Sequence, residues 1–189
     1  MKRPLSSVGL SLVSFVSLSV WSVALLAQTP GKDPIIGTWN LNLQKSKYNG
    51  APMPRSEVRR YEVTEDGFIN YIRVGVDSHG SPTFSQATYK YDGKDYPIYS
   101  QANLPLFYTL GVKPGTQAYR VVDANTVQLT PKDNTGKITF TGVRNRSVSR
   151  DGKTLTDIQK GTNAQGDAVD IIQIFERLEL QAIRTKASR

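Results

Sequence analysis

Few residues of this 189-residue chain could carry acid–base or nucleophilic chemistry, because it contains one histidine and no cysteine. His79 lies in the stretch Asp77–Pro82, whose Ser, Gly and Pro residues are typical of a turn, so we expect it to be exposed. The neighbouring Ser78 does not make a triad with it, because a triad requires a spatial arrangement and not adjacency. One imidazole and no thiolate also argue against a zinc site. We therefore predict no catalytic residue and no metal site.

Two acidic motifs are compatible with chemistry but are poorly specific for it. The stretch Asp92–Asp95 lacks the successive oxygen ligands and the distal Glu of a calcium loop, and its Asp-Gly pair favours a turn. Glu65 and Asp66 are paired carboxylates, yet nothing places them across a cleft from each other as a glycosidase requires. Glycine-rich phosphate loops are absent from the sequence. We expect no cofactor and no enzymatic activity, although a fold does not by itself exclude a reaction.

The N-terminal segment has the pattern of a signal peptide. A basic start is followed by an apolar, serine-interrupted run that ends in a small residue at Ala27. The sequence thus predicts a signal peptide at 1–27, a leader at 28–34, a domain at 35–180 and a polar basic tail at 181–189. An uncleaved anchor is the alternative. We expect a secreted or periplasmic protein with no transmembrane segment after signal removal.

Basic residues outnumber acidic ones by 24 to 16, and removing Lys2 and Arg3 with the signal leaves 22 to 16, a net charge of +6. Such a surface favours contact with an anionic polymer or lipid surface of the cell envelope, and nothing points to specific nucleic-acid binding. A merely solvated basic face is the simpler interpretation. The basic residues form two loose groups. These are Arg55, Arg59 and Arg60, and Arg144, Arg146, Arg150 and Lys153.

Turn signals punctuate the chain from 66 to 166, separated by stretches rich in Val, Ile, Thr, Tyr and Phe. This spacing predicts an all-β antiparallel up-and-down meander of about ten strands. Closure into a barrel of about 8–10 strands removes exposed sheet edges, so we favour a barrel over a sandwich.

Within the clearest strand, Phe68–Asp77, we expect Ile72 and Val74 on the dry face and Tyr71 and Arg73 on the wet face. A change in apolar parity at Gly142 predicts a β-bulge or a strong bend there. An outer-membrane barrel is not supported, because the C-terminal tail is basic and polar where an aromatic strand would be expected.

One segment, 96–115, breaks the rhythm with three prolines and an apolar cluster. Leu106, Phe107 and Tyr108 could form a lid over a barrel mouth, or they could complete the core. Aromatic walls with a few polar groups are typical of small-molecule pockets and equally of filled cores. The candidate contacts for a ligand are Tyr71, Arg73, Tyr89 and Tyr91.

Gly37-Thr38-Trp39, at the start of the first strand, resembles the Gly-x-Trp signature of lipocalins and the wider calycin group. The stretch 36–48 is similar to small exported bacterial lipocalin-like proteins of unknown function. The resemblance implies that Trp39 closes one end of the barrel and that a basic residue packs over it. Arg177 is the best positional candidate and Arg144 the next.

We expect from this an exported lipocalin-like barrel that binds a small, mainly apolar ligand. The alternative is a filled barrel that acts as an envelope interaction module through its basic surface.

Overall fold

The computed structural model describes residues 33–101, 105, 109–133, 140–163 and 165–179. Nearly all of them belong to strands or to the short turns between strands. The strands are β1 (Gly37–Leu41), β2 (Lys47–Asn49), β3 (Ser56–Val63), β4 (Ile69–Val76), β5 (Pro82–Tyr89), β6 (Asp92–Ser100), β7 (Thr116–Asp123), β8 (Thr126–Lys132), β9 (Phe140–Val148), β10 (Thr154–Asn163) and β11 (Ala168–Arg177). Within these ranges no helix has both the length and the apolar character needed to span a membrane.

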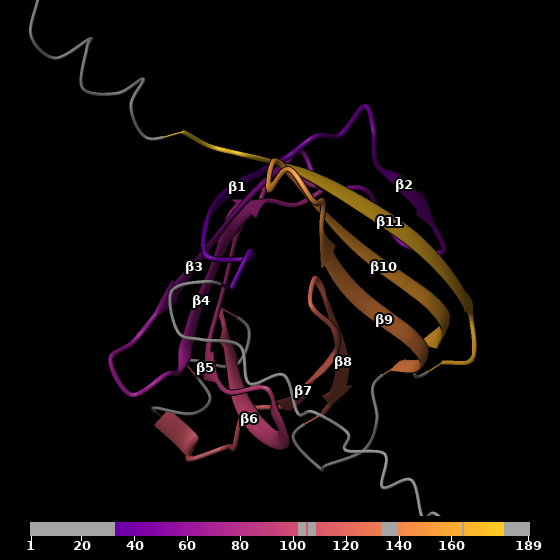
Figure 1. Ribbon diagram of the computed structural model, residues 1–189. Helices are drawn as coiled ribbons and strands as arrows, with labels where there is room; N and C mark the ends of the chain where they lie inside the picture. Colours follow the sequence, from indigo (N-terminus) through magenta and orange to yellow (C-terminus); the bar gives the residue numbers. More distant parts are fainter. Residues whose placement is uncertain (1–32, 102–104, 106–108, 134–139, 164, 180–189) are drawn as a thin grey trace, which may run out of the picture.

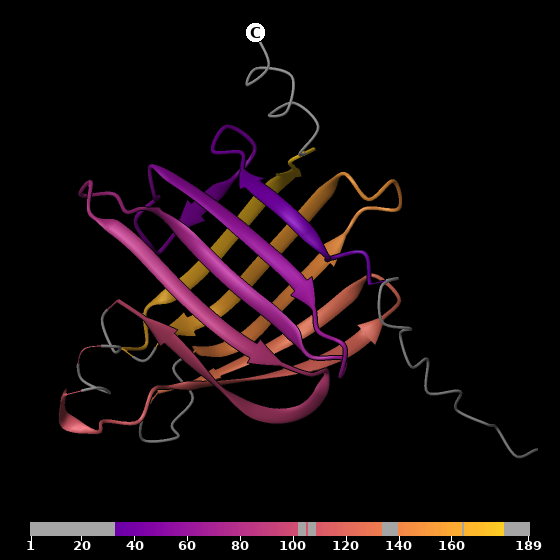
Figure 2. The same ribbon diagram turned by 90° about the vertical axis from the view of Figure 1, so that its left-hand side faces the viewer.

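Ten strands form a closed antiparallel ring, which confirms the predicted barrel and rules out a sandwich (Figure 1). The order is β1-β3-β4-β5-β6-β7-β8-β9-β10-β11, and β11 pairs back with β1. The strands of the near wall cross those of the far wall at a large angle in Figure 2, as tilted strands of a closed barrel must. Closure gives each of these ten strands a neighbour on both sides, although the β5–β6 and β8–β9 pairings each have only three residue pairs.

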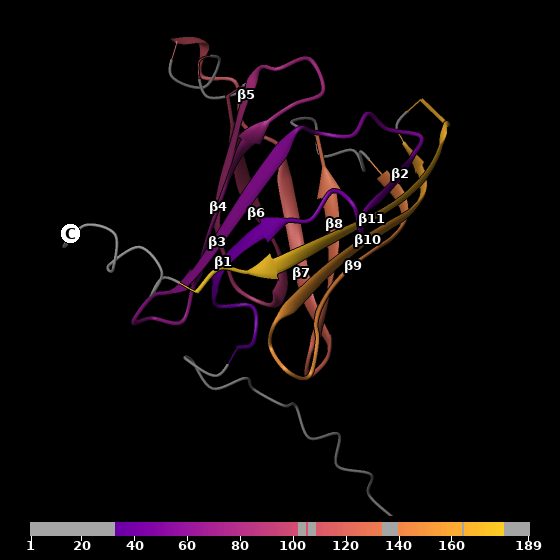
Figure 3. The same cartoon turned by 90° about the horizontal axis from the view of Figure 1, so that it is seen from above.

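The seam of the barrel is formed by β1 and β11, with β2 beside it (Figure 3). β1 pairs with the end of β11, where Trp39 lies opposite Arg177. After a short turn, β2 continues along the same edge and pairs with the beginning of β11, where Tyr48 lies opposite Ile171. The strand β2 therefore lies outside the ring, and the sequence did not predict it because three residues carry too little periodicity.

The faces of β4 are reversed relative to the prediction. Tyr71 is buried and Arg73 half-buried on the inner face, whereas Ile72 and Val74 lie on the outer face, 36% and 46% exposed. The alternation itself is as predicted, but the apolar set was assigned to the interior. Because the barrel interior is polar at this level, the usual rule that the apolar face is the dry one fails here.

The strand β6 was also missed, since its Asp92-Gly93 pair and Pro97 favour a turn and a loop. The residues from Asp92 to Pro97 pair with β7, with a register shift, whereas Ile98 to Ser100 pair with β5. Changing partner at Pro97 avoids the need for the backbone donor that proline lacks. A proline and an Asp-Gly pair are thereby accommodated in one strand.

The two glycines Gly142 and Gly161 face each other across β9 and β10, and each has a positive φ, 147° and 153°. The pairing register runs unbroken past both, so the β-bulge predicted at Gly142 is wrong, whereas the alternative of a strong bend there stays a prediction. Without side chains, the two strands approach closely at this point. A Cβ at Gly142 would collide with the carbonyl oxygen of Lys160 and lie 2.7 Å from Gly161 Cα.

The close approach makes Gly142→Ala strongly destabilising. We expect a loss of about 2–4 kcal/mol in unfolding free energy, from positive φ and overlap with backbone together. Gly166→Ala is the matched control, because Gly166 has φ 88° but open space around it, and it should cost about 1 kcal/mol. Urea unfolding followed by circular dichroism measures both. Equal losses for the two variants would contradict the close-contact explanation.

Candidate functional site

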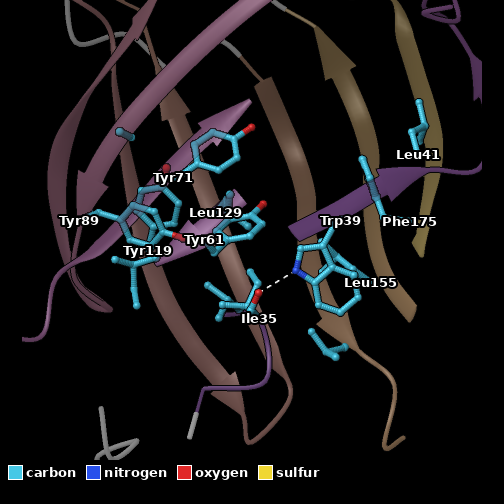
Figure 4. Packing of buried hydrophobic residues seen from close by; sticks show 14 residues of the cluster. Ile35, Trp39, Leu41, Tyr61, Tyr71, Tyr89, Tyr119, Leu129, Leu155 and Phe175 are labelled. Carbon is cyan, nitrogen blue, oxygen red and sulfur yellow. Dashed lines mark hydrogen bonds between the residues drawn. The ribbon is translucent and has the colours of Figure 1, made fainter. Parts of the chain in front are cut away.

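Trp39 of β1 lies toward one end of the barrel and is completely buried among core residues (Figure 4). Its indole Nε1 donates to the carbonyl oxygen of Ile35 at 2.7 Å. The guanidinium carbon of Arg177 lies 4.2 Å from the centroid of the indole ring. The Arg177 guanidinium also donates to the carbonyl oxygens of Gly152, Ile36 and Pro34 at 2.5, 2.7 and 2.6 Å. The basic residue over the tryptophan is thus Arg177, and Arg144 lies elsewhere.

A group of packed tyrosines lies beside Trp39, to its left in Figure 4. The rings of Tyr89 and Tyr119 stack with centroids 3.5 Å apart, and those of Tyr61 and Tyr71 with centroids 5.1 Å apart. Burial raises the pKa of Tyr61, Tyr89 and Tyr119 above that of a free phenol. These tyrosines fill this part of the interior with packed rings, and Tyr71 lies at its border with the cavity described below.

Beyond the tyrosines, the interior becomes polar and charged. Arg59 is buried and lies at the centre of a network with three inward-facing partners: it donates to Glu57 Oε1 at 2.6 Å, to Asp157 Oδ2 at 2.6 Å and to Gln173 Oε1 at 2.8 Å. Its guanidinium also lies over the ring of Phe175, 4.1 Å from the centroid. The protein tolerates this buried charge because the guanidinium contacts two carboxylates, an amide oxygen and an aromatic ring.

Asp157 is the main counter-charge of this network. It accepts from Arg59 and also from Arg146, whose Nη2 lies 3.2 Å from Oδ2, and Arg144 Nε lies 3.9 Å from Oδ1. Burial alone would raise the pKa of Asp157, but Arg146, Arg59 and Arg144 outweigh it and hold the pKa well below its usual range. Asp157 is therefore ionised at neutral pH and is the counter-ion of three arginines.

Next to this network is a cavity of about 330 Å³. It lies toward the end of the barrel opposite Trp39, where β6, β7 and β8 begin or end. Its walls come from seven strands, β4 to β10. The lining residues are Tyr71, Arg73, Ser85, Ile98, Ser100, Thr116, Gln117, Pro131, Lys132, Arg144, Arg146 and Gln159.

The cavity wall is cationic and contains no carboxylate among its lining residues. Lys132 is matched by Asp95, to which it donates at 2.6 Å. By contrast, the buried Nε atoms of Arg73 and Arg144 have no hydrogen-bond partner among the described residues. Arg73 Nη1 is 4.0 Å from Glu57 Oε2, which is an ion-pair distance but not a hydrogen bond. Two guanidinium groups at the cavity are thus incompletely satisfied.

The predicted ligand contacts separate into three sets. Tyr71 and Arg73 line the cavity. Tyr89 and Tyr91 are not among its lining residues: Tyr89 is stacked in the core, and the Tyr91 hydroxyl donates to Asp33 at 2.7 Å near the Trp39 end. Leu106, Phe107 and Tyr108, predicted as a lid, lie outside the described residues.

Sequence reasoning missed Arg144, Arg146, Asp157, Gln117 and Gln159 as interior residues. The available signal was alternation: Arg144 and Arg146 share parity with buried Val148, and Asp157 and Gln159 share parity with buried Leu155. Charged residues in phase with core residues indicate a polar interior, but Arg144 and Arg146 were placed in a loose basic group and Asp157 was given no role.

No protein-family model matches this chain, and no curated protein is significantly similar to it in sequence. Among solved structures, a biogenic amine-binding protein is similar to it, with a TM-score of 0.40 and 11% sequence identity. The match covers 82% of this chain and 72% of that one. This degree of structural similarity does not bear on the ligand, whereas the residues that line the cavity do.

Proposed function

We propose that this protein is an exported barrel that binds a small organic anion in the cavity opposite Trp39. The observation that carries the proposal is the pair of buried, hydrogen-bond-deficient Nε atoms on Arg73 and Arg144 in the cavity wall. An unpaired buried guanidinium donor is costly, and a carboxylate is its best geometric and electrostatic complement. The basic and apolar pattern of residues 1–27 supports export.

Neutral donors and acceptors around the arginines support the same ligand class. Tyr119 donates its hydroxyl to Gln117 Oε1 at 2.7 Å, which leaves the Gln117 NH₂ group as the remaining donor of that side chain. Ser85, Ser100 and Thr116 add hydroxyl groups to the wall. Such groups can complete the hydrogen bonds of a carboxylate whose charge is met by arginine.

The size and polarity of the cavity differ from the mainly apolar ligand expected from the sequence. A volume of about 330 Å³ is at the lower end of the 300–1,000 Å³ typical of ligand pockets, so a long lipid chain has no room. Tyr71, Ile98 and Pro131 offer limited apolar contact. We therefore retain a small ligand but place its charge, and not its apolar surface, at the centre of recognition.

The alternative of an interaction module with a basic surface receives less support from the side-chain positions. Of the seven residues in the two basic groups, Arg59, Arg144 and Arg146 face the interior. Their charges are directed at the cavity and its network, which leaves Arg55, Arg60, Arg150 and Lys153 exposed. The remaining surface charge is scattered over different strands and turns.

Charge selectivity tests the proposal directly. We expect butyrate to raise the melting temperature of the protein, whereas butyramide and butylamine, which have similar size, do not. Arg73→Gln/Arg144→Gln should weaken butyrate binding by at least about tenfold, because one charge-assisted contact of its carboxylate is worth about 1.5 kcal/mol or more. Isothermal titration calorimetry measures the change.

Arg60→Gln is the matched control, because Arg60 is exposed and pairs with Glu62 on the outside of β3. It should leave butyrate affinity within about twofold of the unmodified protein, as expected for an exposed charge outside the site. Stronger binding of butylamine than of butyrate would overturn the proposal.

A further inference from the structure

Among the residues that the structure describes, the interior charges do not balance. Four arginines, Arg59, Arg73, Arg144 and Arg146, share the carboxylates of Glu57 and Asp157. Four positive charges against two negative ones leave an excess of two. Lys132 adds nothing to this excess, because Asp95 accepts from it.

The excess is placed on two separate walls. Arg73 comes from β4 and Arg144 from β9. Around the ring, five strand pairings separate β4 from β9 in one direction and five in the other, so the two strands are opposite each other. Each arginine brings one buried Nε without a hydrogen-bond partner among the described residues.

Each of these two arginines is also close to a carboxylate that is already engaged elsewhere. Arg73 Nη1 is 4.0 Å from Glu57 Oε2, beyond hydrogen-bond distance, while Glu57 Oε1 accepts from Arg59 at 2.6 Å. Arg144 Nε is 3.9 Å from Asp157 Oδ1, also too far for a hydrogen bond, while Asp157 Oδ2 accepts from Arg59 and Arg146. The internal carboxylates therefore hold the arginines in place without satisfying them.

From this arrangement we infer that the ligand is a divalent organic acid, a small dicarboxylate that spans the cavity with one carboxylate at Arg73 and the other at Arg144. The inference rests on the proposed function and specifies the ligand class of the same cavity. A dicarboxylate supplies the two negative charges that the interior lacks and supplies them at two separated points. An inorganic dianion such as phosphate carries similar charge at a single centre.

Calorimetric titration with succinate, butyrate and inorganic phosphate at neutral pH tests the inference. Succinate and butyrate have the same number of carbon atoms and differ by one carboxylate. We expect succinate to bind at least about ten times more tightly than butyrate, the gain from one further charge-assisted contact. Glutarate and adipate should reveal one preferred chain length, and phosphate should bind no better than butyrate.

The single variants Arg73→Gln and Arg144→Gln provide the sharper test. Each removes one of two anchoring points, so each should reduce the succinate-to-butyrate affinity ratio to near one. A merely structural role for the arginines would weaken both ligands together and leave the ratio unchanged. Arg73→Lys and Arg144→Lys keep the charge and should retain part of the ratio, and they replace the Gln variants if those do not fold.

The outcomes separate this inference from the proposed function. Equal affinity for succinate and butyrate, with both lost in the double variant, would overturn the dicarboxylate and keep the anion site. Tight phosphate binding would also overturn it, in favour of a single-centre dianion. No binding of any anion would overturn both.

Discussion

Asp157→Asn is expected to lower the free energy of unfolding by about 3–5 kcal/mol, because it removes one partner from a buried, charge-paired network. The asparagine side chain has nearly the same volume as that of aspartate, so the substitution creates no cavity. The loss comes from Arg59 and Arg146, which are at most 3% exposed and would keep their charges without this carboxylate. The high basicity of arginine prevents either from escaping by deprotonation.

The exposed pair Arg60 and Glu62 provides the control for Asp157→Asn. Their side chains are 54% and 50% exposed, so Glu62→Gln should change stability by less than about 1 kcal/mol. Asp157→Asn/Arg146→Gln should recover part of the loss, because it removes a charge that the first substitution leaves uncompensated. A loss below about 1 kcal/mol for Asp157→Asn would contradict the role assigned to the network.

The same residue gives the protein a defined acid sensitivity. The pKa of Asp157 is lower in the folded state than in the unfolded chain, where it is about 3.9. Its stabilisation is complete above that unfolded value and is lost as the pH falls from about 4 toward the folded pKa. Part of the acid destabilisation of the unmodified protein should therefore be absent in Asp157→Asn.

The barrel itself followed from the sequence because turns and alternation are local signals. Asx-Gly and Gly turns at regular intervals determine where antiparallel strands reverse, whatever the interior contains. The clearest predicted strand, Phe68–Asp77, agrees with β4 to within one residue at each end. β6 was the exception among the long strands, since its Pro97 is tolerated only through a change of pairing partner that no local pattern encodes.

The candidate site was less predictable, because alternate residues of a strand point to opposite faces and the sequence pattern does not say which face is the interior. For β4, the sequence offers Ile72 and Val74 on one face and Tyr71 and Arg73 on the other. Choosing the apolar set as the interior is correct for an ordinary core. It is wrong for this half of the barrel, where Arg73 needs Glu57 from the neighbouring strand as a partner.

The division of the interior into two halves explains this difference. Near Trp39, most inward residues are aromatic or aliphatic and fill the space, which gives the barrel its hydrophobic stability; the exception is Arg59, which pairs with Trp39 on the neighbouring strand. Farther along the same strands, inward residues become charged, and they leave a cavity. The filled half can supply the free energy that the polar half costs, so a ligand site with excess charge can exist in a stable domain.

Trp39→Ala tests the filled half and is expected to cost about 3–5 kcal/mol of unfolding free energy, the range for truncating a large buried aromatic side chain. The substitution removes an indole with no exposed surface, its hydrogen bond to Ile35 and its contact with the Arg177 guanidinium. Val74→Ala, on the outer face of β4, should change stability by less than about 0.5 kcal/mol. Far-ultraviolet circular dichroism during urea unfolding measures both without depending on tryptophan fluorescence. Because Trp39 and the cavity are at opposite ends, Trp39→Ala should retain anion binding under conditions where it is folded. A large loss of stability together with unchanged anion affinity would show that the two halves of the interior have separate roles, one in the stability of the barrel and the other in anion recognition.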